Sequence, residues 1–166
     1  MKDLYPDIDI NLDGGTDSFQ EGVQIVERNN IGVIIKHPTD NLYLLAEWKK
    51  SNWSGFLTGG IEEGETLEQT AQKEILEETG YKNISVITPM DFVSHGLFFH
   101  VIKHVNRLAH YRLVFAQLAD LEQDEIDEEE KAIAEFVWVP EQEVFAKLTR
   151  KDMKLLWEFY KQSRIV

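Results

Sequence analysis

The chain has 166 residues, of which 43% are hydrophobic, and this is enough for one domain with its own core. It contains no cysteine, which excludes disulfide bonds and thiolate metal sites, and no apolar run approaches the roughly 18 residues needed to cross a bilayer. The N-terminus does not resemble a basic, apolar signal peptide, so we expect a cytoplasmic protein. Thirty acidic and 17 basic residues give a formal net charge of −13, which disfavours stable binding to nucleic acid or to an anionic membrane.

The chain is predicted to comprise an acidic, turn-rich N-terminal extension, residues 1–22, and a single domain, residues 23–166. Within the domain, short apolar or β-branched runs bounded by turn residues predict strands. These runs are 23–27, 31–36, 42–48, 56–58, 84–93, 97–101, 111–118 and 135–139. Residues 120–131 are an acidic stretch that we expect to be a loop, and residues 141–147 can form a short helix.

Two longer helices have clear signals. The first begins after Thr66, where Gln69 completes a Thr-x-x-Gln capping box, and ends at Gly80, which suits the left-handed conformation that terminates helices. The second follows Thr149 as its predicted N-cap. Its apolar face is formed by Met153, Leu156, Trp157 and Tyr160. Strands alternating with helices in this order predict an α/β fold with a mixed sheet covered by helices.

Three carboxylates gather on one side of the first helix. Glu74, Glu77 and Glu78 are spaced i, i+3 and i+4, so they share an arc of roughly 100°. Like charges at this spacing repel one another, and a divalent cation would offset that repulsion. Ligands that are all oxygen suit Mg²⁺, with Mn²⁺ as an alternative. A glutamate-rich face is more often a solvated surface, however, so the helix alone does not decide between the two interpretations.

The turn before this helix favours the functional interpretation. Gly59, Gly60 and Gly64 give the backbone conformations that other residues avoid and permit close approach to a ligand. Glu65 ends the turn and can reach Lys73, eight residues later, which would tie the loop to the helix.

The segment from Gly59 to Tyr81 resembles the Nudix box. The family pattern is Gly, five residues, Glu, seven residues, Arg-Glu-apolar, one residue, Glu-Glu, one residue, Gly-apolar. This chain has the matching residues at the same spacing: Gly59, Glu65, Lys73-Glu74-Ile75, Glu77-Glu78 and Gly80-Tyr81. Lys73 stands where the family has Arg, and Lys keeps the charge but lacks the planar fork of guanidinium. The difference therefore concerns the precision of the loop more than cation binding.

The resemblance implies an α/β/α sandwich and a Mg²⁺-dependent hydrolase of a phosphoanhydride bond in a nucleoside di- or triphosphate-type substrate. By their positions in the box, Glu74 and Glu78 would be the main metal ligands, with Glu77 close behind them. The carbonyl oxygen of Gly59 would join these ligands.

Family members often add a glutamate from a loop before a late strand. The matching stretch here is Glu128–Glu130, and we favour Glu130, although a solvated acidic loop remains an equal alternative. The reaction needs a group that accepts a proton from the attacking water, and Glu77, Glu78 or Glu130 would serve as this catalytic base.

Candidate substrate contacts are fewer. Trp53, close before the box, could stack on a base, although core packing is the commoner role of an aromatic residue. Lys50 and Arg112 are the basic residues that could hold terminal phosphates. His95, beside Gly96 in an expected turn, is the best candidate among the histidines for a second base or a substrate contact.

Three functions fit this pattern. The leading one is a nucleotide pyrophosphohydrolase, and the second is a module of the same fold that binds or senses a nucleotide without turnover. The retained carboxylates of the helix favour the enzyme, because a non-catalytic module has no physical need to hold repelling charges together. The third is an interaction protein that forms a homodimer through its last helix or N-terminal extension, which is compatible with the first.

Overall fold

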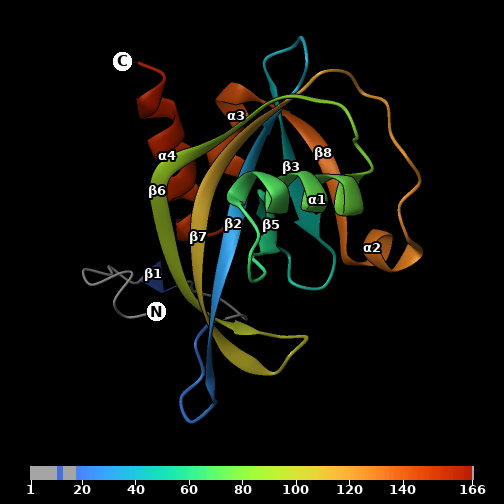
Figure 1. Ribbon diagram of the computed structural model, residues 1–166. Helices are drawn as coiled ribbons and strands as arrows, with labels where there is room; N and C mark the ends of the chain where they lie inside the picture. The colour runs from blue at the N-terminus through green and yellow to red at the C-terminus, as the bar shows by residue number, and fades with distance from the viewer. Residues whose placement is uncertain (1–10, 13–17, 166) are drawn as a thin grey trace.

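Residues 11–12 and 18–165 are described by a computed structural model in which strands and helices alternate along the chain (Figure 1). The strands are β1 (Asn11–Leu12), β2 (Ile25–Lys36), β3 (Leu42–Trp48), β4 (Ser54–Gly55), β5 (Leu57–Gly60), β6 (Ile84–His100), β7 (Val105–Leu118) and β8 (Ala134–Pro140). The helices are α1 (Leu67–Thr79), α2 (Glu128–Ile133), α3 (Glu141–Lys147) and α4 (Lys151–Ser163).

Strand β2 organises the sheet. It pairs in parallel with β7 along its whole length, from Ile25↔Asn106 to Lys36↔Gln117. Its other edge is divided, because β5 pairs antiparallel with its middle residues and β3 with its last ones. The sheet continues from β3 to β8 and β4, and from β7 to β6 and β1. The described residues therefore form the mixed sheet that the sequence predicts.

Alternating side chains of the central strands supply two separate cores. In β2, Val33 faces the side covered by α1, whereas Ile34 faces the side covered by α4. The core under α1 also contains Ile31, Ile35, Leu57, Ala71, Ile75, Val114 and Ala116. The core under α4 also contains Tyr43, Phe56, Leu113, Leu156, Trp157 and Tyr160. Figure 1 shows the two helices on opposite faces of the sheet, which confirms the α/β/α sandwich.

One long strand replaces two of the predicted ones. The sequence predicts a turn around Gly96, but β6 runs unbroken past it and pairs with β7 as far as His100. Gly96 has a different role, because a Cβ atom here would collide with the Asp152 carboxylate at the start of α4. Glycine at this position therefore admits the end of a helix and does not mark a chain reversal.

Two further predictions about helices are wrong. The acidic stretch predicted as a loop ends in α2, whose first turn carries three glutamates, a favourable arrangement at the positive end of a helix. Thr149 is not the N-cap of α4; Arg150 takes that place without a capping side chain. The Thr149 hydroxyl instead accepts a hydrogen bond of 3.0 Å from the Ser54 backbone. Within the described residues, no helix is long and apolar enough to span a membrane.

Part of the predicted N-terminal extension contacts the domain. Strand β1 pairs in parallel with β6, Asn11 beside Gly96 and Leu12 beside Leu97. The Asn106 side chain also exchanges hydrogen bonds of 2.9 and 2.7 Å with the backbone of residue 20. The boundary at residue 22 remains a prediction, since these contacts do not show whether residues 23–166 fold without the segment.

The close packing of α4 on β2 gives a testable prediction. A Cβ atom at Gly32 would lie 2.6 Å from Leu156 Cδ1, and Leu156 is fully buried. We therefore expect Gly32→Val to lower the free energy of unfolding by about 1–3 kcal/mol, as overpacking does. Urea denaturation measures this change. The cost of Leu156→Ala should be smaller in the Gly32→Val background than in the parent, and two independent costs that simply add would contradict the proposed contact.

Candidate active site

The loop between β5 and α1 is fastened by one carboxylate. Glu65 Oε1 lies 2.8 Å from Lys73 Nζ, and Glu65 Oε2 accepts a hydrogen bond of 2.9 Å from the Thr70 hydroxyl. The hydrogen bond from Lys73, followed by that from Thr70, lowers the pKa of Glu65. The predicted tie between Glu65 and Lys73 is confirmed. Thr70 was not predicted, because a single threonine in the first turn of a helix carries no signal of its own.

Both ends of α1 are as the sequence predicts. The Gln69 backbone donates to Thr66 Oγ1 at 3.2 Å, while Gln69 Oε1 accepts from the Thr66 backbone at 2.9 Å, which completes the capping box. At the other end Gly80 has a φ of +77° and donates to the Leu76 carbonyl at 2.9 Å. These caps fix the start and the end of the helix and therefore its rotation against the sheet.

Gly59 is the point at which β5 and α1 approach most closely. The Glu74 side chain lies over it, and a Cβ atom at Gly59 would collide with Glu74 Cγ and Cδ. Glycine is therefore required if the carboxylate is to lie against the strand. The Glu74 side chain is 15% exposed, and its Oε1 atom is 4.0 Å from Lys73 Nζ. The backbone of Gly59 and the carboxylate of Glu74, both predicted metal ligands, are thus brought together.

The carboxyls of Glu74 and Glu78 are poorly stabilised as anions. Burial, and then the charge of Glu77, raises the pKa of Glu74 to about 6. Burial, and then the charges of Glu74 and Glu130, raises the pKa of Glu78 well above its ordinary value. The two carboxyls also hydrogen-bond to each other. Both shifts favour a proton bound to this pair over two adjacent negative charges when no cation is present.

Helix α2 brings a fourth carboxylate to the box glutamates from far along the chain. Glu130 lies close enough to Glu74 and Glu78 for its charge to raise both pKa values. Its neighbour Glu128 instead pairs with Lys131 at 2.9 Å. The structure thus places the favoured member of the acidic stretch beside the box, and we call Glu74, Glu77, Glu78 and Glu130 the glutamate cluster.

The chemistry of the glutamate cluster fits a divalent cation. Its donors are hard oxygens, and the raised pKa values mean that additional positive charge would stabilise them. In the part of the chain that the structure describes, no three carboxylate or imidazole groups already stand at metal-coordinating positions, so binding would need side-chain adjustment. The predicted ligands are Gly59, Glu74, Glu77 and Glu78.

A hollow of about 360 Å³ lies where β3 ends and β8 begins, beside α2. It is lined by Glu47, Trp48, Lys49, Asn52, Trp53, Ser54 and Glu135, and we call it the tryptophan hollow. The ring of Trp53 packs edge-on against Phe98, with 5.0 Å between ring centroids, so this residue belongs partly to the core and partly to the hollow. The Lys49 backbone N–H donates a hydrogen bond of 3.0 Å to the Ile133 carbonyl at the end of α2.

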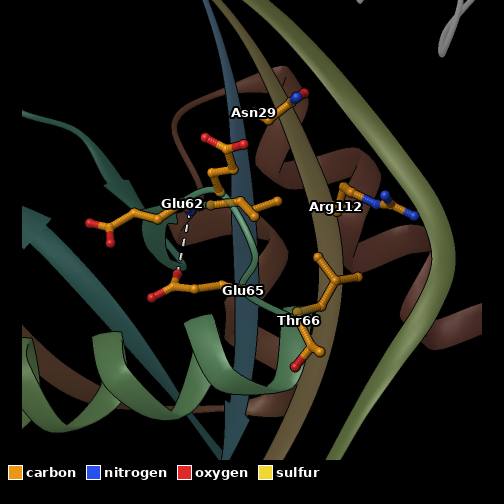
Figure 2. A pocket seen from close by; sticks show the side chains of 8 residues that line it. Asn29, Glu62, Glu65, Thr66 and Arg112 are labelled. Carbon is orange, nitrogen blue, oxygen red and sulfur yellow. Dashed lines mark hydrogen bonds between the residues drawn. The ribbon is translucent and has the colours of Figure 1, made fainter.

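The predicted contacts Lys50 and Arg112 do not share this hollow. Lys50 is exposed on the turn after β3. Arg112 lines a second hollow of about 400 Å³ near the start of α1, together with Asn29, Glu62 and Thr66. Figure 2 shows its guanidinium directed away from the Glu65 carboxylate. The structure therefore separates Arg112 from Trp53, and neither residue's role as a substrate contact is tested by this arrangement.

His95 lies in the middle of β6, not in a turn. Its Nδ1 atom is 2.7 Å from Nδ1 of His110, and His110 Nε2 is 2.7 Å from Glu27 Oε1. His110 is fully buried. The sequence could not indicate these contacts, because they depend on the register of β2, β6 and β7.

The NUDIX domain family model matches residues 26–161 of this chain. The chain belongs to the NUDIX family. The match extends well beyond the box at Gly59–Tyr81, from the start of β2 to the last helix, and so covers all the elements that carry the glutamate cluster.

Two NUDIX relatives are similar over part of their length. An RNA pyrophosphohydrolase of Caulobacter vibrioides (strain NA1000 / CB15N) is 36% identical over 63 residues, which is 36% of each chain. The putative mutator protein MutT4 of Mycobacterium tuberculosis (strain CDC 1551 / Oshkosh) is 35% identical over 104 residues, 60% of this chain and 38% of that protein. The aligned part thus spans little more than a third of either relative.

Among solved structures, the E. coli dihydroneopterin triphosphate pyrophosphohydrolase has a similar fold. Its TM-score to this chain is 0.64 with 16% sequence identity, and the match covers 83% of this chain and 99% of that one. At this identity the likeness concerns the NUDIX fold alone.

The lysine in this NUDIX box gives one prediction. Lys73→Ala should release Glu65 and lower both the melting temperature and, by up to about a hundredfold, kcat/KM, because loss of the tie displaces the loop. Lys73→Arg should keep both near the parent values, since the charge remains. Thermal unfolding and a phosphoanhydride hydrolysis assay measure the two effects. Unchanged stability and rate in Lys73→Ala would show that the tie has no structural role.

The raised pKa values of Glu74 and Glu78 predict how the stability of the metal-free protein depends on pH. A proton binds more tightly to folded than to unfolded Glu74, so the metal-free protein should lose stability as pH rises from about 4.5 through about 6. Glu74→Gln and Glu78→Gln should reduce this loss and should raise apo stability at pH 7 by at least roughly 0.2–0.5 kcal/mol. Urea denaturation in EDTA at pH 5 and pH 7 tests this. Glu68→Gln, at an exposed position of the same helix, is the control; equal effects in all three variants would argue against a strained cluster.

Proposed function

We propose that this chain is a Mg²⁺-dependent pyrophosphohydrolase that cleaves a phosphoanhydride bond in a nucleoside di- or triphosphate-type substrate, with Mn²⁺ as an alternative cation. The observation that carries the proposal is the glutamate cluster. Two of its carboxyls have raised pKa values, and two separate helices supply its members. A protein would not retain this unfavourable arrangement for stability alone, because removing one charge would relieve it.

The roles divide between the two helices. The carboxylates of Glu74, Glu77 and Glu78, with the Gly59 carbonyl, would hold the cation. A bound divalent cation supplies charge neutralisation for the phosphates and a more acidic water. The water oxygen forms a bond to phosphorus, the anhydride P–O bond breaks, and the second phosphate leaves. The proton of the water passes to Glu77, Glu78 or Glu130, so no nucleophilic side chain is needed.

The tryptophan hollow is the proposed place for the part of the substrate away from the anhydride. It lies beside α2, which carries Glu130, and the indole rings of Trp48 and Trp53 are aromatic surfaces on which a base or similar ring could stack. Lys49 is the basic residue of its lining. We therefore place phosphate binding at Lys49 and not at Lys50, and we keep Trp53 as the proposed stacking surface.

The names of the relatives agree with this reaction class. One is an RNA pyrophosphohydrolase and one solved structure is a dihydroneopterin triphosphate pyrophosphohydrolase. Both names describe cleavage of a phosphoanhydride bond, but one substrate is an RNA and the other is a pterin triphosphate. The reaction is therefore the part of the proposal that rests on these relatives, and the substrate class rests on the residues of this chain.

A hydrolysis assay tests the proposal. Purified protein is incubated with nucleoside triphosphates, ADP-ribose, dinucleoside polyphosphates and sugar nucleotides, with Mg²⁺ or Mn²⁺, and phosphate or nucleotide products are measured. We expect turnover of at least one of these classes and none in excess EDTA. Glu78→Gln should lower kcat by about a hundredfold or more, because the site loses a charged ligand or base.

The matched control is Glu68→Gln, which removes an equal charge from an exposed position on α1 outside the cluster and should leave kcat unchanged. Full turnover in EDTA would exclude the cation-dependent reaction. Tight nucleotide binding by the parent without hydrolysis in any condition would favour the non-catalytic module instead.

A further inference from the structure

Basic side chains gather on the face of the sheet opposite α1. Arg28 of β2 alternates with Gly32, which lies under Leu156 of α4, and therefore projects to the α4 side. Arg107 of β7 shares that face with Tyr111, a residue of the core under α4. His100 of β6 joins them.

The contacts of His100 and Arg107 place them next to each other. The His100 ring stacks on Phe98 with 6.5 Å between centroids, and Phe98 is the register partner of Arg107 across β6 and β7. We call Arg28, His100 and Arg107 the basic cluster.

The two guanidinium charges of the basic cluster are not neutralised within the described residues. No salt bridge there involves Arg28, His100 or Arg107, and the buried Nε atom of Arg107 has no hydrogen-bond partner. Burial, and then the charge of Arg28, lowers the pKa of Arg107. Burial, and then the charge of Arg107, lowers the pKa of His100. A buried cationic donor without a partner, such as Arg107 Nε, is costly, so a bound anion would stabilise this face.

A third arginine, Arg150, differs from Arg28 and Arg107 because it has an acidic partner. Arg150 lies over the rings of Trp53 and Phe98, at 4.3 and 3.9 Å from their centroids, and its Nε atom donates to Asp152 Oδ1 at 3.1 Å. Its charge is therefore balanced inside the protein. Arg150 also joins the two regions, because Trp53 lines the tryptophan hollow while Phe98 lies beside the basic cluster.

Two adjacent glycines separate the basic cluster from the glutamate cluster. Gly59 faces Glu74 on the α1 side, and a Cβ atom at Gly60 would lie 3.3 Å from Arg28 Nη2 on the other side. Successive residues of a strand point to opposite faces, so only the thickness of β5 lies between the carboxylate and the guanidinium. A small molecule that reaches around the end of β5 could contact both.

We propose that Arg28 and Arg107 bind a second anionic group of the substrate, a phosphate monoester remote from the anhydride that is cleaved. The inference rests on the proposed function for the position of the anhydride. Two guanidinium groups with a histidine beside them match a dianion better than a single carboxylate, because each guanidinium can donate two parallel hydrogen bonds to it. The substrate class is then a nucleotide or dinucleotide anhydride that carries an additional phosphate.

A small molecule fits this site better than a nucleic acid. The acidic side chains Glu47 and Glu135 line the adjoining hollow, and the chain has a net charge of −13, so a long phosphate backbone would meet repulsion outside the basic cluster. A single phosphate group bound within the basic cluster would not meet this repulsion.

Binding measured without hydrolysis tests the site separately from catalysis. Isothermal titration in EDTA compares adenosine 3′,5′-bisphosphate with adenosine 5′-monophosphate as probes. We expect the bisphosphate to bind the parent protein about ten- to a hundredfold more tightly, which corresponds to the usual strength of hydrogen bonds between charged groups. Arg28→Gln, at an exposed position, and Arg107→Gln should each remove most of this preference, and melting temperatures show whether the variants are folded.

Lys147→Gln is the control, since it removes one positive charge from an exposed position at the end of α3. Equal affinity for the two probes, or a preference that survives both arginine substitutions, would overturn the proposal. Tighter binding of a 5′-phosphorylated oligonucleotide than of the bisphosphate would overturn the assignment to a small molecule.

A kinetic comparison links the site to the reaction. Coenzyme A and its 3′-dephospho form contain the same anhydride and differ in one phosphate monoester, as do NADPH and NADH. We expect higher kcat/KM for the phosphorylated member of a pair, with the difference lost in Arg28→Gln and kept in Lys147→Gln. Selective binding of the bisphosphate without hydrolysis of any anhydride would support the anion site and overturn the proposed function. Hydrolysis with no preference for the phosphorylated substrate would support the proposed function and overturn the anion site.

Discussion

The approach of α1 to β5 at Gly59 is the constraint on which the site depends. Because glycine leaves no side chain there, the Glu74 carboxyl lies against the strand and becomes largely buried. The capping box and Gly80 fix the rotation of the helix, so Glu78, one turn later, is drawn into the same poorly solvated place. The raised pKa values follow from this packing, and the cluster can relax only by keeping a proton or by binding a cation.

The loop and the sheet hold this arrangement from two directions. Glu65, bonded to Lys73 and Thr70, fastens the loop to the first turns of α1. The pairing of β3 with β8 brings α2 to the box, because α2 leads directly into β8. A lysine in the place of the family's arginine still reaches Glu65, which explains how the loop keeps its shape with one hydrogen-bonding arm instead of a fork.

Local features of the sequence were enough to predict the fold and most of the glutamate cluster. The capping box, the glycine at the helix end and the spacing of Glu74, Glu77 and Glu78 are determined within a few residues, and the structure has them as predicted. Features that depend on distant partners were missed. Gly96 resembles a turn residue until Asp152 is seen above it, and the contact of His110 with Glu27 exists only through the register of β2 with β7. Glu130 was favoured among three adjacent glutamates only through the family resemblance. The three residues are identical in sequence, and only the direction in which α2 points each side chain distinguishes them.

The net charge of −13 conceals two local excesses of opposite sign. On the α1 side of Gly59 four clustered glutamates outnumber the one nearby cation, Lys73. On the α4 side of Gly60 the guanidinium groups of Arg28 and Arg107 have no ion-pair partner among the described residues. Direct pairing between the two clusters would remove both excesses, but the backbone of β5 lies between them. Each is therefore left to a ligand, a cation on one side and an anion on the other, and a substrate with phosphates at two separate positions is the kind of molecule that would use both. The acidic remainder of the surface limits such binding to molecules small enough to stay within these two places.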